Sequence, residues 1–167
     1  ENIVENEEGL KKVIAKITEK IGQPALVEEY IKGREITVGI IGYENPTVLP
    51  ILEISYSGVK TNTFEHKMFD KEKITCPAPL PPELEQKIKS TALSIYRVLN
   101  AKDYGRIDMI LSEDGIPYFL EINTFAGLTM SSGKTHHGYM GYMAKASGLS
   151  GREFFGAIIE SAKKRYY

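Results

Sequence analysis

Four polar residues interrupt two short stretches that are otherwise mostly apolar. Residues 105–129 read GRIDMILSEDGIPYFLEINTFAGLT, with Arg106 and Asp108 in the first stretch and Glu121 and Asn123 in the second. Charged residues are depleted from β-strands, so their presence in two strand-like stretches calls for a chemical reason. We therefore ask whether the fold brings them together.

The two stretches are predicted to form a β-hairpin. Asp114 and Gly115 stand between them, and Asp-Gly is a strong signal for a two-residue turn. With these residues as the loop, Glu113 lies opposite Ile116, and the register of every later pair follows.

That register places the four polar side chains on one face. Asp108 lies opposite Glu121, and Arg106 lies opposite Asn123. Directly opposed residues point to the same face, with Cβ atoms about 4.5–5.5 Å apart. The other face is expected to be buried, and its members are Ile107, Met109, Leu120 and Ile122.

Two carboxylates this close repel each other unless something positive joins them. A shared proton, the arginine or a metal ion could do so. Oxygen ligands from Asp, Glu and Asn suit magnesium, which proteins usually hold through one or two carboxylates plus substrate phosphates. An arginine beside it suits a phosphoryl group. The alternative is a surface hairpin with a cross-strand salt bridge, because structural ion pairs can imitate a site.

Composition bounds the remaining possibilities. The 167 residues, 42% hydrophobic and 26% charged, suit one globular domain or at most two small ones. A net charge of −1 gives no support for nucleic-acid or membrane partners, and no apolar run is long enough to span a bilayer. The lone Cys76 fits a reducing, cytoplasmic setting. Because the chain opens Glu-Asn-Ile, we expect a segment, residues 1–167, of something longer.

The elements that must position the polar cluster follow from periodicity and breakers. A helix is expected to end at Gly22, and further helices to start at Pro81-Pro82, to end at Gly148, and to start at a capping box of Ser150 with Glu153. Strands are expected at residues 25–30, 35–41 and 47–56, the last with Pro50 inside it, and a long loop at 60–82. The predicted fold is α+β, a mostly antiparallel sheet flanked by helices.

Two other motifs do not form sites by their spacing. Gly133-Lys134-Thr135 lacks the glycine that a phosphate-binding P-loop needs at position 128, where Leu128 stands. The adjacent His136 and His137 diverge on a helix and cannot share a metal as an i, i+4 pair could.

With the hairpin, the EEYIKGREITVGI stretch and the FEHK stretch together, the chain resembles the C-terminal half of the D-alanine–D-alanine ligases, which are ATP-grasp carboxylate–amine ligases. The most specific part is GRIDMILSEDGIPYFLEINT. The resemblance implies phosphoryl transfer from ATP to a D-alanine carboxylate, an acyl phosphate, and its displacement by the amine of a second D-alanine, in cell-wall precursor synthesis. It implies ATP and two magnesium or manganese ions as cofactors, and a possible homodimer.

The resemblance also implies residue roles. Asp108 would hold one metal ion, Glu121 would bridge two, and Asn123 would bind the second. Arg106 and Lys67 would act on the transferring phosphoryl group. The nucleotide contacts implied are Glu28, Glu29, Tyr30, Ile31, Glu35 and Lys67, and the substrate residues implied are Gly127, Ser131 and Ser132.

The chain departs from the family pattern on the acceptor side. Met68 stands where a tyrosine is frequent, Phe125-Ala126-Gly127 replaces Ser-Pro-Gly, and residues 130–137 are a few residues longer. The family's N-terminal substrate domain, lysine strand and Gly-rich loop are not in this sequence. A non-catalytic module with this fold, or an ATP-grasp ligase for another carboxylate and amine, therefore remain alternatives, and the chain alone is expected to be inactive.

Overall fold

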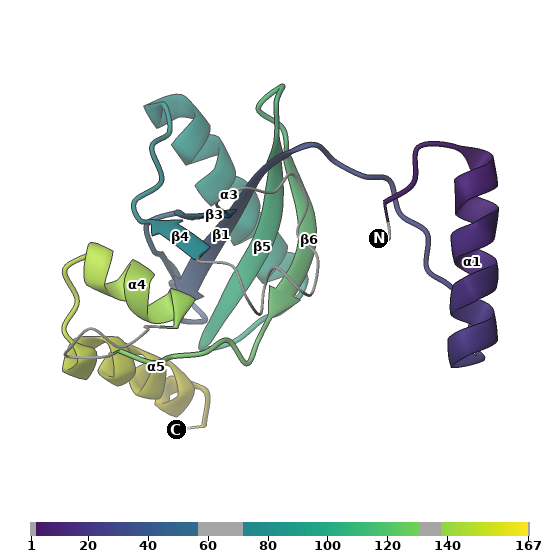
Figure 1. The fold of residues 1–167 in the computed structure, drawn as a ribbon. Coiled ribbons are helices and arrows are strands. Elements are labelled where there is room, and N and C mark those ends of the chain that lie inside the picture. Colours follow the sequence, from purple (N-terminus) through teal and green to yellow (C-terminus); the bar gives the residue numbers. More distant parts are fainter. Residues whose placement is uncertain (1–2, 57–71, 131–137, 167) are drawn as a thin grey trace.

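The computed structural model describes residues 3–56, 72–130 and 138–166 (Figure 1). Its elements are α1 (Glu7–Ile21), β1 (Gly33–Ile41), β2 (Thr47–Val48), β3 (Leu52–Tyr56), β4 (Glu72–Thr75), α3 (Pro82–Val98), β5 (Tyr104–Ser112), β6 (Pro117–Asn123), α4 (Tyr139–Ala146) and α5 (Gly151–Tyr166). An antiparallel sheet flanked by helices confirms the predicted α+β class.

The sheet has the strand order β4-β3-β1-β5-β6, with β2 paired to β1 beside this path, and every pair is antiparallel. β1 and β5 pair along nine residues, from Gly33 opposite Ser112 to Ile41 opposite Tyr104. Because opposed residues share a face, the register between these two strands decides which side chains of β1 lie beside the polar residues of β5.

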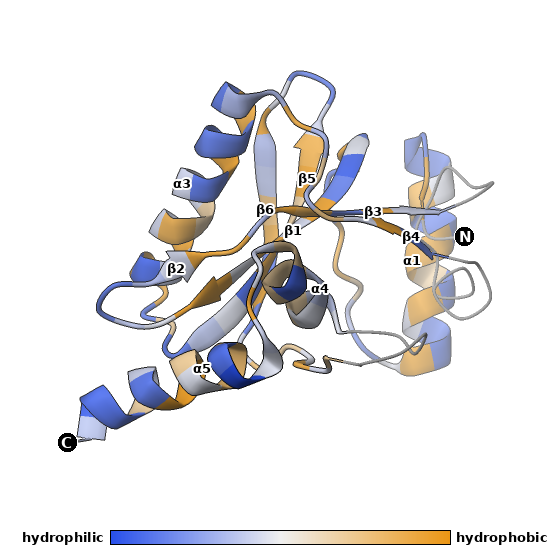
Figure 2. Cartoon of the chain, turned by 90° about the vertical axis from the view of Figure 1, so that its left-hand side faces the viewer, coloured by the Kyte–Doolittle hydropathy of each residue, from blue (hydrophilic) through white to orange (hydrophobic). Residues whose placement is uncertain are grey.

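One face of the sheet is covered by α3. Ile88, Ala92 and Tyr96 recur every four residues on this helix and pack against Ile107 and Met109 of β5. Figure 2 shows the hydrophobic side of α3 turned toward the sheet and its hydrophilic side turned away. This face therefore forms the larger part of the core and carries no polar cluster.

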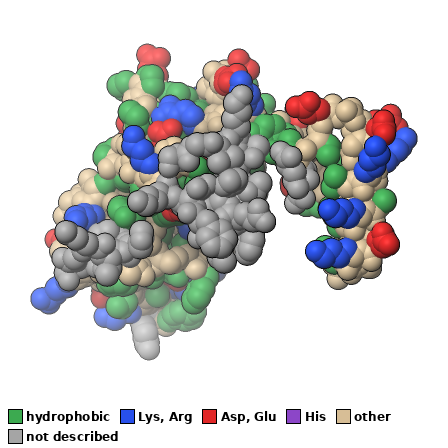
Figure 3. All heavy atoms as spheres, viewed as in Figure 1, with side chains coloured by type: hydrophobic (Ala, Val, Ile, Leu, Met, Phe, Trp, Pro, Cys, Tyr) green, Lys and Arg blue, Asp and Glu red, His purple; other side chains and the backbone are tan. Residues whose placement is uncertain are grey.

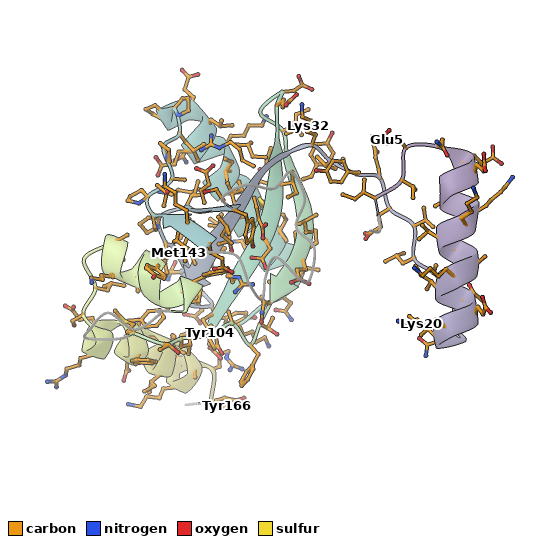
Figure 4. All side chains as sticks on the ribbon, viewed as in Figure 1. Glu5, Lys20, Lys32, Tyr104, Met143 and Tyr166 are labelled. Carbon is orange, nitrogen blue, oxygen red and sulfur yellow. The ribbon has the colours of Figure 1, made fainter. Side chains whose placement is uncertain are left out.

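The opposite face is covered at one end by α4 and α5. Gly39 of β1 makes the close approach of α4 possible, since a Cβ there would lie 2.9 Å from both Met140 Sδ and Met143 Cε. The Gly39 N–H lies 3.1 Å from Met143 Sδ, and Figure 4 shows Met143 between α4 and the sheet. Phe154 of α5 is fully buried in the same cluster.

α1 stands apart from the sheet (Figure 1). The Asn6 side chain accepts the Gly9 N–H at its start, and Gly22 ends it with φ +71, as predicted. The helix has no buried residue. Apolar side chains of α1 and residues 25–30 line a cavity of about 390 Å³. Figure 3 shows acidic and basic side chains close together on the surface of the helix.

Three sequence predictions about strands were wrong. Residues 25–30 are extended but pair with no strand in the described part of the chain. Residues 47–56 form two strands, because Pro50 lacks the N–H that a continuous ladder needs. The predicted loop at 60–82 contains β4, which pairs with β3 as an edge strand.

The predicted helix boundaries were more accurate. Pro82 opens α3, and Gly148, with φ +83, follows α4. The capping box is confirmed, since Glu153 Oε2 accepts hydrogen bonds from the Ser150 N–H at 2.8 Å and from the Ser150 hydroxyl at 2.6 Å.

Candidate active site

The β5–β6 hairpin turns through three residues and not two. The Ser112 N–H donates to the Ile116 carbonyl at 3.0 Å, and the Gly115 N–H donates to the Ser112 carbonyl at 3.0 Å. Glu113 lies within the loop and does not pair with Ile116, so the predicted two-residue turn was wrong. Gly115 takes the left-handed conformation with φ +72, which is typical of a three-residue hairpin loop.

A β-bulge compensates for the extra loop residue. Met109 pairs with Phe119 whereas Asp108 pairs with Glu121, which leaves Leu120 without a partner on β5. A bulge re-aims the extra side chain. Leu120 is 54% exposed, so the prediction that it is buried was wrong.

The predicted pairs beyond the bulge are confirmed. Arg106 lies opposite Asn123, and Asp108 lies opposite Glu121. The Arg106 Nε donates to Asp108 Oδ1 at 2.8 Å, and the Arg106 Nη2 donates to Asp108 Oδ2 at 2.7 Å. Of the three possible partners for the carboxylates, the arginine is the one paired with Asp108, and this ion pair runs along β5 and not across the hairpin.

Burial and charge act in opposite directions on Arg106. Its side chain and that of Asp108 are only 16% and 17% exposed. Burial lowers the pKa of Arg106, but the hydrogen bonds and the charge of Asp108, with smaller contributions from Tyr139 and Glu121, outweigh it and raise the pKa above its usual value. The guanidinium stays charged, and only two of its five N–H groups are used on Asp108, so donors remain for a ligand.

Thr37 is a site residue that sequence reasoning missed. It lies opposite Asp108 in the β1–β5 register, is 1% exposed, and its hydroxyl donates to Asp108 Oδ1 at 2.6 Å. Asp108 is therefore held by donors from two strands. The one sequence feature that could have indicated Thr37 is its hydroxyl within the otherwise apolar ITVGI run. Its partner Asp108 is 71 residues away in the sequence, and only the sheet register reveals that the two residues meet.

Tyr139 is a second residue whose place at the site was missed. It stands beside Met140 and close to Met143, and for such a run core packing is the ordinary explanation. The structure places Tyr139 at the first turn of α4, with the Arg106 Cζ 5.0 Å from its ring centroid. Its hydroxyl donates to Glu72 Oε2 at 2.9 Å. Burial, followed by the hydrogen bond to Glu72, raises the pKa of Tyr139, so the hydroxyl keeps its proton.

The other expected metal ligands lie on the same face. Glu121 is exposed, and Asn123 Oδ1 accepts the Phe125 N–H at 3.0 Å. Among the described residues, no group of three or more His, Cys, Asp and Glu side chains could hold a metal ion. Two carboxylates and an amide fit a magnesium ion that takes its remaining ligands from phosphates and water, and do not fit a site built from protein ligands alone.

The expected nucleotide contacts divide into two groups. Glu35 of β1 lies opposite Ile110, two positions from the Thr37–Asp108 pair, so it shares the face of the polar cluster. Residues 28–31 lie on the extended segment between α1 and β1, with residues 28–30 exposed and Ile31 partly buried. Lys32, which follows, forms an ion pair with Glu113 at 2.7 Å, beside the tip of the hairpin (Figure 4).

The expected substrate and loop residues are only partly described. Gly127 is exposed, after β6. A Cβ on Gly138 would lie 2.3 Å from the Gly127 carbonyl oxygen, so the segment after β6 runs directly against the start of α4. The other residues of interest lie outside the described residues: Lys67, Met68, Ser131, Ser132, residues 133–135, His136 and His137.

An antiparallel sheet with this polar hairpin and helices on both faces matches a known family. The family model "D-ala D-ala ligase C-terminus" covers residues 2–160. The chain belongs to this family, whose members are ATP-grasp ligase C-terminal domains, and the predicted resemblance is confirmed. No described helix is both long and apolar enough to cross a membrane.

Relatives agree with this assignment. The chain is 36% identical over 145 residues to a D-alanine–D-alanine ligase of Bordetella petrii, an alignment that covers 86% of this chain and 42% of that protein. The structure of the Bacillus anthracis ligase complexed with ATP is similar, with a TM-score of 0.71, 28% identity and coverage of 96% and 48% of the two chains. The VanG D-Ala:D-Ser ligase of Enterococcus faecalis has a TM-score of 0.71, 26% identity and coverage of 93% and 43%. The chain thus spans about half the length of these relatives.

Proposed function

We propose that this chain is the ATP- and magnesium-binding half of a D-alanine–D-alanine ligase-like enzyme that joins a carboxylate to an amine through an acyl phosphate. The observation that carries the proposal is the hairpin register, which sets Asp108 opposite Glu121 and Arg106 opposite Asn123 on one face of the sheet. A strand pair that serves only as a scaffold has no need of two opposed carboxylates beside a largely buried arginine.

Each residue has a role in this proposal. Asp108, Glu121 and Asn123 would hold two magnesium ions, which would neutralise charge on the phosphates when bound. Arg106 would direct its free N–H groups at the transferring phosphoryl group, because phosphoryl transfer needs positioned cations more than covalent help. Lys67, outside the described residues, would be a second cation.

The remaining assignments concern nucleotide and substrate. Glu35 shares the face of the cluster and would accept hydrogen bonds from the ribose hydroxyls. Residues 28–31 would bind the adenine, and their backbone groups are not used in a strand ladder within the described structure. Gly127, with Ser131 and Ser132, would face the amino acid substrate.

The ion pair of Asp108 with Arg106 makes a metal-only test insensitive, since the carboxylate is already compensated. The test is therefore calorimetric titration of the chain with ATP, with and without magnesium. We expect magnesium to tighten ATP binding, and Asp108→Asn to abolish this magnesium-dependent gain. Asp114→Asn changes an aspartate in the loop of the same hairpin and is the matched control, expected to behave as wild type.

If the affinity of the wild-type chain for ATP is the same with and without magnesium, the proposed site is contradicted and a non-catalytic module with this fold is favoured. An Asp114→Asn variant that loses the gain as fully as Asp108→Asn would show that hairpin charge, and not the cluster, is responsible.

A second candidate keeps the chemistry but changes the acceptor. Phe125 is 91% exposed on the segment that leads to Gly127. At the position of Phe125, the family frequently has serine. A D-Ala:D-Ser ligase is among the similar structures, so similarity of fold does not select the acceptor. The test uses a longer protein that contains this chain and has ligase activity. There, Phe125→Ser should change the ratio of kcat/KM for D-alanine to kcat/KM for D-serine as acceptor, while leaving KM for ATP unchanged. Equal changes in both would contradict an acceptor role for this segment.

A further inference from the structure

The guanidinium of Arg106 is held on one side by Asp108 and covered on another by an aromatic ring. Asp108 takes two of its donors at 2.8 and 2.7 Å. The Arg106 Cζ lies 5.0 Å from the centroid of the Tyr139 ring, within the range of a cation–π interaction. The ring comes from α4, which is separate in sequence from both strands of the hairpin.

The sheet register explains why the ring can lie there. Gly39 stands opposite Arg106 on β1 and Asn123 stands opposite it on β6. Since Gly39 has no side chain, α4 packs directly on β1, with Met140 and Met143 filling the space. This close packing brings Tyr139, at the first turn of α4, over the guanidinium.

The ring is itself fixed from a third element. The Tyr139 hydroxyl donates to Glu72 at the start of edge strand β4, at 2.9 Å. A continuous path of contacts therefore runs from Glu72 through Tyr139 and Arg106 to Asp108, and the Thr37 hydroxyl donates to Asp108 Oδ1, the oxygen that also accepts the Arg106 Nε–H. This path joins β4 and α4 to the pair of strands that carries the proposed metal ligands.

We propose that Tyr139 is a positioning residue for Arg106: its ring, anchored at Glu72, holds the guanidinium in the orientation in which its free N–H groups meet a phosphoryl group. The orientation of Arg106 is inferred from the observed contacts alone. The claim that Arg106 in this orientation contacts a phosphoryl group rests on the proposed function. A tyrosine that only filled space in the core would have no need of its ring over the cation or of its hydroxyl on Glu72.

The first test is independent of any ligand and uses NMR of the arginine Nε–H groups in the 167-residue chain. The Arg106 signal, identified by its loss in Arg106→Lys, is expected to be displaced by the ring current and to show little internal motion. Tyr139→Phe keeps the ring and should keep this signature. Tyr139→Leu removes the ring and should return the signal toward that of a mobile arginine. Tyr139→Met, a long apolar side chain without a ring, replaces Leu if that variant does not fold.

The matched control is Tyr43→Leu, which removes another tyrosine ring lying under a cation, with Lys102 Nζ 5.2 Å from its centroid. This change should leave the Arg106 signal where it is. An unchanged Arg106 signal in Tyr139→Leu and Tyr139→Met would overturn the proposal.

The second test measures the affinity for ATP with magnesium. Tyr139→Leu should weaken it by about 2- to 30-fold, the range expected for loss of a cation–π contact, and Tyr139→Phe should stay within about 2-fold of wild type. If the wild-type chain binds no ATP, the proposed function fails, whereas the NMR test still decides whether Tyr139 positions Arg106. Equal affinities of wild type and Tyr139→Leu would overturn the proposed consequence for the phosphoryl group.

Discussion

At the scale of single residues, the candidate site depends on how Asp108 is held. Its carboxylate accepts two hydrogen bonds from Arg106 and one from Thr37, whose hydroxyl is buried. Hydrogen bonds to charged groups contribute more than neutral ones, and a charged group that loses a donor without gaining water is penalised. Thr37 therefore stabilises both the fold and the orientation of the carboxylate.

Thr37→Val should reduce the free energy of unfolding by about 1.5–3 kcal/mol, because it removes a donor from a largely buried carboxylate while keeping the side-chain shape. Urea unfolding measures this. Thr37→Ser keeps the hydroxyl and loses one methyl group, so it should cost only about 1 kcal/mol. A Val variant as stable as wild type would show that water or Arg106 compensates for the lost hydroxyl.

The residues of the site differ in how far the sequence alone predicts them. Arg106, Asp108, Glu121 and Asn123 are predictable because their partners lie within one hairpin, where alternation and a turn signal set the register. Thr37 and Tyr139 are not, because their contacts cross between elements far apart in the chain. Tyr139 in particular sits in an apolar run, for which core packing is the ordinary explanation.

At the scale of elements, the β5–β6 register was predicted correctly beyond the bulge although two of its premises were wrong. The loop has one more residue than Asp-Gly alone indicates, and the bulge at Leu120 takes up one residue on β6. The two shifts cancel, so Asp108 still meets Glu121. A bulge leaves no mark in a pattern of apolar residues, which is why Leu120 was placed on the wrong face.

The capping box at the start of α5 gives a pH-dependent prediction. Hydrogen bonds from the Ser150 side chain and backbone lower the pKa of Glu153. Because the folded-state pKa is lowered, the carboxylate stabilises the fold above its ordinary pKa, and this contribution is lost as the pH falls through the lowered value. Ser150→Ala should raise the pKa of Glu153 back toward its ordinary value, as measured by NMR titration of the carboxyl carbon.

Ser94→Ala is the control for this titration, since the Ser94 hydroxyl donates to the Ser90 carbonyl of its own helix α3. It should leave the Glu153 titration unchanged. If Ser150→Ala did the same, the capping box would not be what lowers the pKa.

The helix α1 should contribute little to the stability of the sheet. It has no buried residue, and neither hydrophobic cluster includes any of its side chains. A 15-residue helix is also marginal in water when it lacks tertiary packing. Deleting residues 1–24 should therefore change Tm by no more than about 2–4 °C, the shift typical of about 1 kcal/mol in a chain of this size.

Deletion of residues 151–167 is the contrasting variant, because it removes the fully buried Phe154 and should prevent cooperative unfolding. Hydrogen exchange gives an independent check, with fast exchange expected along α1 and slow exchange along β1 and β5. Strong protection of α1 in the isolated chain would mean that its apolar side is covered.

At the scale of the whole molecule, the described helices cover the polar cluster only in part. α4 covers Arg106 through Tyr139, but Glu121 is exposed and Phe125 is 91% exposed. Where water reaches bound phosphates, the effective dielectric is high and each contact to the phosphates weakens. The similar ligases are about twice as long, so their chains have further residues that could supply contacts to a nucleotide.

We therefore predict that the 167-residue chain folds and binds ATP weakly, but neither ligates D-alanine nor releases phosphate from ATP measurably. Holding the reacting carboxylate in line with the terminal phosphate can supply about 7–11 kcal/mol of barrier reduction, and the similar ligases have further residues that could hold it there. The assay is phosphate release with ATP, magnesium and D-alanine, run beside Asp108→Asn/Glu121→Gln to detect contaminating activity. Phosphate release that disappears in the double variant would show that this half alone positions both reactants.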